Sequence, residues 1–182
     1  MNSINPNKSN MNKPHGSHSF WRILVIMMTL LFSFSSEVFA QQAGTPRVSA
    51  IRPFDAYING GNDFERMRLK DLVYEVQSSV YFYDNVVKTY GSTPVNVYTD
   101  FNGFIRLPQA NFQKATIELI TVRINEPSQI TGALNLNTLS SFTKLRYVYF
   151  LTAFPYTLPQ ISQVVTSAGT NFIVVFKSEP GS

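Results

Sequence analysis

The chain of 182 residues contains no cysteine, two histidines and a single tryptophan. The histidines, His15 and His18, and the tryptophan, Trp21, all lie close to the N-terminus. The rest of the chain therefore has no side chains for a Ser-His-Asp triad, a cysteine nucleophile or a zinc site of thiolates and imidazoles. Disulfides are excluded throughout. We expect no catalytic, cofactor-binding or metal-binding residues, and hence a protein that is not an enzyme.

The first 40 residues have the pattern of a secretory signal peptide. An apolar run over residues 21–34 follows the basic residues Lys8 and Lys13 and carries Arg22 at its start. The run leads to Val38-Phe39-Ala40, which ends in a small residue suited to cleavage. The sequence predicts residues 1–40 as a signal peptide and residues 41–182 as a single α/β domain. An uncleaved anchor is the alternative, because about 20 residues can span a bilayer.

Export predicts a periplasmic, cell-surface or secreted protein with no stable membrane span after cleavage. Residues 41–182 carry 12 Lys and Arg against 10 Asp and Glu, since three basic residues and one acidic residue lie in the first 40. The densest basic group, Arg66 to Lys70, is interleaved with acidic side chains. This alternation is typical of a solvated helix face, so we expect no nucleic-acid partner.

The N-terminal half of the domain shows one helical pattern and one hairpin pattern. Residues 41–53 are polar, contain Gly44 and Pro46, and are expected to form a flexible lead-in. Asn62 followed by Glu65 predicts a helix start. The apolar positions expected on that helix face are Phe64, Met67, Leu72, Val73 and Val76.

Short β-type runs follow this helix. Residues 80–83 predict a strand, and residues 95–98 and 104–107 flank Asn102-Gly103. Asn-Gly accepts the positive φ angles of a type I′ turn, so this segment predicts a β-hairpin.

The second half repeats at a step of 26 residues. Apolar runs over 119–124, 145–150 and 171–176 align Val122 with Val148 and Val174. The same step aligns Ile124 with Phe150 and Phe176. Helical spacing between the runs predicts short crossover helices and therefore parallel strands. The expected fold is α/β: an N-terminal part that contains a β-hairpin, then a βαβαβ unit.

The series Leu136, Leu139, Phe142, Leu145, Val148 and Phe150 resembles a leucine-rich repeat over residues of about 112–177. The resemblance implies a short solenoid with one strand per repeat. The asparagine or cysteine of that family would fall at Ala153. A βαβαβ half of an ordinary α/β domain has the same spacing and stays open as an alternative.

The strands carry apolar and aromatic residues on both faces, which permits two interpretations. Either the N-terminal half covers the second face, as strands that are apolar on both sides require, or that face is open and binds a partner. The candidate binding residues in the second case are Arg123, Arg146, Tyr147, Tyr149, Phe172 and Val175.

The sequence thus favours a non-catalytic exported binding protein of the bacterial cell envelope or exterior, with a protein or a glycan as partner. The alternatives are a small carboxylate-dependent enzyme acting on polysaccharide and a structural protein of the envelope. The enzyme would need two carboxylates in one cleft.

Cleavage after Ala40 is directly testable. N-terminal sequencing of the exported protein should begin at Gln41, as free or cyclised glutamine, because the apolar run ends at a small-residue site. Recovery of the intact chain from washed inner membranes would contradict this prediction.

Overall fold

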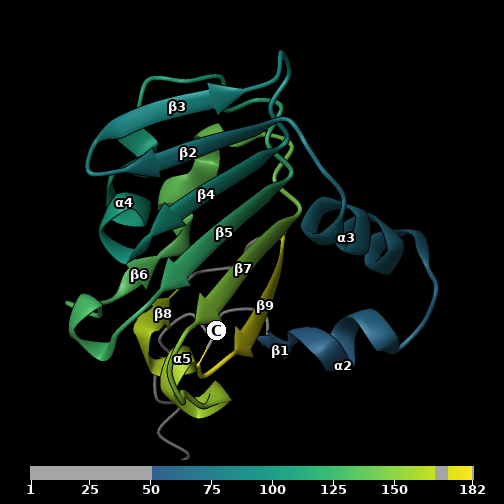
Figure 1. Cartoon of the computed structure of the whole chain (residues 1–182), viewed down its shortest axis with the longest axis vertical. Coiled ribbons are helices and arrows are strands. Elements are labelled where there is room, and N and C mark those ends of the chain that lie inside the picture. The colour runs from purple at the N-terminus through teal and green to yellow at the C-terminus, as the bar shows by residue number, and fades with distance from the viewer. Residues whose placement is uncertain (1–50, 167–171, 182) are drawn as a thin grey trace, which may run out of the picture. The chain divides into compact units, whose positions relative to one another are not determined.

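The computed structural model describes residues 51–166 and 172–181 (Figure 1). The expected signal peptide and residues 41–50 of the expected lead-in lie outside the described residues. Within the described part, no helix has the length and apolar character needed to cross a membrane.

A seven-stranded sheet forms the centre of the domain, in the order β1-β9-β7-β5-β4-β2-β3 (Figure 1). All neighbouring strands are parallel except the antiparallel pair β2 and β3. The strands are β1 Arg52–Pro53, β2 Ser79–Tyr83, β3 Val86–Tyr90, β4 Asn96–Asp100, β5 Leu119–Ile124, β7 Tyr147–Thr152 and β9 Ile173–Ser178. The α/β class predicted from the sequence is confirmed.

The connections from β4 onward pack on one face of the sheet and form the larger core (Figure 1). Each joins strands that are neighbours in the sheet, as short right-handed crossovers do. The elements involved are α4 Phe101–Arg106, η1 Leu107–Gln109, η2 Pro127–Gln129, η3 Leu136–Ser141 and α5 Leu158–Val164, with the small parallel sheet of β6 Leu134–Asn135 and β8 Val165–Thr166. A leucine-rich-repeat solenoid stays a prediction.

Helices α2, Phe54–Asn59, and α3, Phe64–Tyr74, form a second core on the opposite face. Phe54 stacks on Tyr149 with ring centroids 4.6 Å apart. Leu69 and Leu72 of α3 are fully buried with Leu119, Tyr147 and Val175 of the sheet. The strands β5, β7 and β9 are therefore covered on both faces, as the first of the two interpretations predicted.

The helix after Gly61 exists, but its start and its buried face differ from the prediction. Asp63, not Asn62, is the N-cap, and its carboxylate accepts a hydrogen bond from the Arg66 backbone N–H. Phe64 and Met67 are exposed, and Val76 lies beyond the helix end in solvent. The lead-in also ends early, because Arg52 and Pro53 pair with β9 as strand β1.

The hairpin predicted around Asn102-Gly103 is wrong. Gly103 lies in helix α4, and its N–H donates to the Asp100 side chain, which caps that helix. A Cβ on Gly103 would collide with Thr99 and lie 2.9 Å from the Phe82 carbonyl oxygen, so close packing requires this glycine. The hairpin joins β2 to β3, where Asp84 and Asn85 both have positive φ, as in a type I′ turn.

The 26-residue register is half right. Val148 pairs with Val174 and Phe150 with Phe176, as predicted. Between β5 and β7, however, Ile120 pairs with Val148 and Val122 with Phe150, which is a step of 28 residues. The connection between these strands holds η2, β6 and η3, and its extra length shifts the alignment.

Phe150 should be essential for stability, because it is fully buried at the centre of the larger core and its ring lies 6.3 Å from that of Phe104. Phe150→Ala is expected to lower the free energy of unfolding by about 3–5 kcal/mol in denaturant titrations. The matched control Phe64→Ala, at a side chain 65% exposed, should cost about 1 kcal/mol or less. Similar losses for both variants would contradict this assignment of the core.

Candidate functional site

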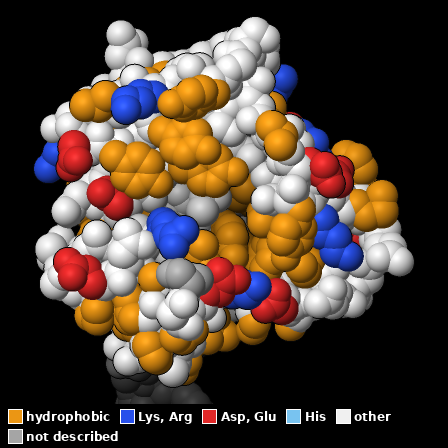
Figure 2. Space-filling model, viewed as in Figure 1, with side chains coloured by type: hydrophobic (Ala, Val, Ile, Leu, Met, Phe, Trp, Pro, Cys, Tyr) orange, Lys and Arg blue, Asp and Glu red, His pale blue; other side chains and the backbone are white. Residues whose placement is uncertain are grey.

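Four tyrosines lie on the part of the sheet that α2 and α3 leave uncovered. Tyr81 and Tyr83 come from β2, Tyr90 from β3 and Tyr98 from β4. With Val86 and Lys88 of β3 they form a surface that we call the tyrosine face. Figure 2 shows apolar side chains gathered in this region of the molecule, with charged side chains around them.

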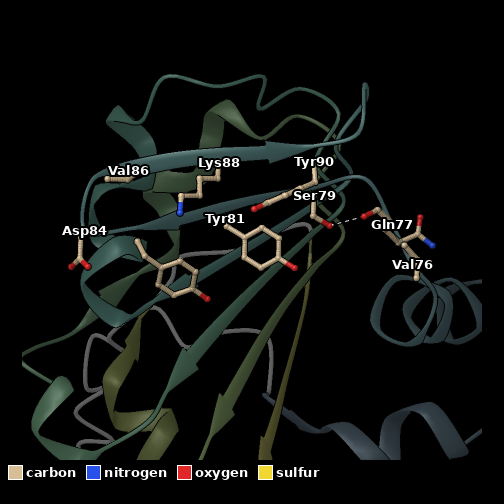
Figure 3. Close-up of a pocket in the computed structure, with 9 residues that line it drawn as sticks. Val76, Gln77, Ser79, Tyr81, Asp84, Val86, Lys88 and Tyr90 are labelled. Atoms are coloured by element: carbon tan, nitrogen blue, oxygen red, sulfur yellow. Dashed lines mark hydrogen bonds between the residues drawn. The ribbon is translucent and has the colours of Figure 1, made fainter.

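A cavity of about 650 Å³ opens over β2 and β3 (Figure 3). This volume lies within the range of about 300–1,000 Å³ that is typical of ligand pockets. Its lining combines aromatic, aliphatic and polar side chains: Val76, Gln77, Ser79, Tyr81, Tyr83, Asp84, Val86, Lys88 and Tyr90.

The β2–β3 hairpin fixes which side chains enter the cavity. Its register pairs Tyr83 with Val86, Tyr81 with Lys88 and Ser79 with Tyr90. Paired residues of antiparallel strands share a face, and side chains alternate along each strand. Val80 and Phe82 consequently enter the larger core, and all six paired side chains line the cavity.

The tyrosine rings support one another across the strands. Tyr81 stacks on Tyr98 with centroids 5.0 Å apart and packs edge-on against Tyr90 at 5.5 Å. Tyr81 is still 40% exposed and Tyr90 is 59% exposed. These contacts hold the rings in place without helical cover, which gives a preformed aromatic surface.

Partial burial is the main cause of a raised pKa for the phenols of Tyr83 and Tyr98, and the carboxylate of Asp100 raises the Tyr83 pKa further. Both phenols are therefore neutral at ordinary pH and can donate a hydrogen bond. Lys88 is exposed and forms no ion pair with any residue of the described part. The cavity thus offers neutral hydroxyls and one free ammonium group.

An ion-pair network holds α3 against the sheet beside this face. Arg68 donates two hydrogen bonds to the Glu118 carboxylate, at 3.0 and 2.7 Å. Arg146 pairs with Glu65 and Glu118, and the Tyr147 hydroxyl donates to Glu65. The Arg68 guanidinium is the main cause that lowers the pKa of Glu118. Arg146 and Tyr147, predicted as binding residues, instead attach the helix layer to the sheet.

The open-face interpretation is wrong for three of the six candidate residues. Tyr147, Tyr149 and Val175 are buried beneath α2 and α3. Phe172 is half-buried and packs against the larger core. Arg123 is exposed, with its guanidinium donating to Asn125, and it lies close enough to Tyr83 to lower that phenol's pKa.

Sequence reasoning missed Tyr81, Tyr83, Tyr90 and Tyr98. The alternation Val80-Tyr81-Phe82-Tyr83 within a predicted strand was the available signal, since it puts tyrosine on one face and aliphatic and phenylalanine side chains on the other.

Within residues 51–166 and 172–181, no three His, Cys, Asp or Glu side chains gather closely enough to hold a metal ion. No protein-family model, curated protein or solved structure significantly matches the chain.

Two tyrosines from opposite ends of the same sheet row should respond differently to truncation. Tyr149 is 5% exposed and stacked on Phe54, so Tyr149→Ala should lower the free energy of unfolding by about 3–5 kcal/mol. Tyr81→Ala should cost about 1.5 kcal/mol or less, because only exposed ring contacts are lost. Thermal and denaturant unfolding measure both, and equal losses would mean that Tyr81 belongs to the core.

Proposed function

We propose that this chain is an exported, non-catalytic binding protein of the bacterial cell envelope or exterior, and that its partner is another protein held on the tyrosine face. The observation that carries the proposal is the group of exposed tyrosines around the cavity of about 650 Å³. Exposed apolar patches with polar rims are typical of interaction sites, and tyrosine is enriched among residues that dominate binding energy.

The lining of the cavity supports binding rather than hydrolysis. Glycoside hydrolysis uses two carboxylates on either side of the scissile bond, and Asp84 is the single acidic side chain of this lining. Gln77, Ser79 and the phenols supply neutral hydrogen-bonding groups, which suit recognition of an uncharged backbone or hydroxyl.

The position of β3 supports a protein partner over a glycan. Three of the nine lining side chains come from β3, the last strand of the described sheet. A protein segment beside β3 can contact these side chains and the strand's own backbone, whereas a glycan uses the cavity alone.

Site-specific photocrosslinking in the producing cells tests this proposal. Benzoylphenylalanine in place of Tyr90, 59% exposed on the tyrosine face, should yield a discrete protein adduct after irradiation. The matched control replaces Ile105, 49% exposed on α4 and behind the sheet, and should give none.

Three outcomes are informative. A protein adduct at Tyr90 that disappears with the added substitution Tyr81→Ala supports the proposal. Adducts of equal yield at both positions, or none at Tyr90, would overturn it. Recovery of carbohydrate in the Tyr90 adduct would replace the protein partner with a glycan.

A further inference from the structure

Strand β3 presents unpaired backbone groups to its outer side. The two-residue turn at Asp84 and Asn85 makes Tyr83 and Val86 a hydrogen-bonded pair, and such pairs then recur at every second residue. Lys88 and Tyr90 therefore bond to β2. The N–H and C=O groups of Val87 and Thr89 point away from the sheet, and β3 has no further neighbour among the described strands.

The two edges of the described sheet differ in what they can accept. At the far edge, β1 has two residues, and one of them is Pro53, which has no N–H group. At the near edge, β3 has five residues, four of them exposed. Short strands and prolines protect an edge from pairing, so β1 is protected by its length and composition and β3 is not.

The side chains of β3 that border the cavity define what a neighbouring strand should carry. Val86, Lys88 and Tyr90 lie on the tyrosine face at alternate positions. An added strand would put its own alternate side chains opposite them, at the short distances that separate cross-strand pairs. The complement of apolar, cationic and aromatic residues is an acidic residue with apolar residues two positions to either side.

We propose that a partner protein binds by adding an extended segment to β3 as an antiparallel strand, with an acidic side chain opposite Lys88 and apolar side chains opposite Val86 and Tyr90. This inference rests on the proposed function and specifies how the tyrosine face binds. Backbone hydrogen bonds to Val87 and Thr89 supply affinity, and the alternate side chains supply specificity, as in other cases of strand addition.

A second copy of this chain is a poorer occupant of the edge. Antiparallel self-pairing of β3 centred on its middle residue would bring Lys88 directly opposite Lys88 of the other copy. Like charges at directly opposed positions destabilise a pair of strands. The same lysine attracts an acidic segment, so charge favours a different partner over self-association.

The probe is a blocked heptapeptide with glutamate at its centre, valines two residues to either side and threonines elsewhere. It is titrated into the 15N-labelled purified protein, followed by NMR and amide hydrogen exchange. The amide signals of Val87 and Thr89 should shift, and their exchange at saturation should slow at least about tenfold, because each amide gains a hydrogen bond. Replacement of the central glutamate by lysine should weaken binding several-fold.

Two N-methylated peptides provide the matched control. Methylation of the residue after the glutamate removes the N–H that would bond to Val87, and binding should fall about tenfold. Methylation of the glutamate itself removes an N–H that would point to solvent, and binding should be nearly unchanged. Equal binding of both would overturn strand addition, even if the peptide occupies the cavity.

On the protein side, Thr89→Pro removes an outward N–H without breaking a bond to β2 and should abolish peptide binding. Thr89→Val keeps that N–H and should bind normally. Retained binding by the proline variant, a concentration-dependent dimer in place of the complex, or no binding of the heptapeptide at all would each overturn the inference. If crosslinks at Tyr90 still form in cells, the proposed function survives such a result. If they do not, the proposed function itself fails.

Discussion

The packing of α2 and α3 on only part of one sheet face decides the role of every tyrosine in this domain. Phe54 stacks on Tyr149, and Leu69 and Leu72 pack over Leu119 and Tyr147. These helices cover β5, β7 and β9, and the row that contains Tyr149 continues across the sheet through Thr121 to Tyr98 and Tyr81. One transverse row of side chains is therefore core at one end and exposed surface at the other.

Polar contacts at the edge of the helix layer fix where that boundary falls. Glu118 precedes β5 and receives Arg68 from α3 and Arg146 from the segment before β7. Asn96 of β4 is buried and donates to the Leu72 carbonyl oxygen at 2.7 Å. Removal of one partner from such a contact leaves a poorly solvated polar group, so displacement of α3 toward β2 would cost the domain these bonds. The tyrosine face stays open because α3 is held on its other side.

The sequence predicted those parts of the fold that depend on local periodicity. The parallel strands of the second half and the register between β7 and β9 follow from hydrophobic spacing that is visible without any long-range information. The hairpin could not be placed in this way, because Asn102-Gly103 and Asp84-Asn85 both suit a tight turn. Gly103 is needed for close packing of α4 near Thr99 and the Phe82 carbonyl oxygen, which only the folded arrangement reveals.

The candidate site was harder to predict for the same physical reason. Tyrosine suits a buried face and an exposed one equally well, because its ring packs and its hydroxyl accepts solvent. Tyr147 and Tyr81 occupy strands of similar composition, and only the helix layer distinguishes them. Lys88 shows the same ambiguity at the edge. A lysine in the middle of an edge strand opposes self-pairing, and the same charge, next to Val86 and Tyr90, selects an acidic segment. Protection against aggregation and selection of a partner are therefore two consequences of one side chain.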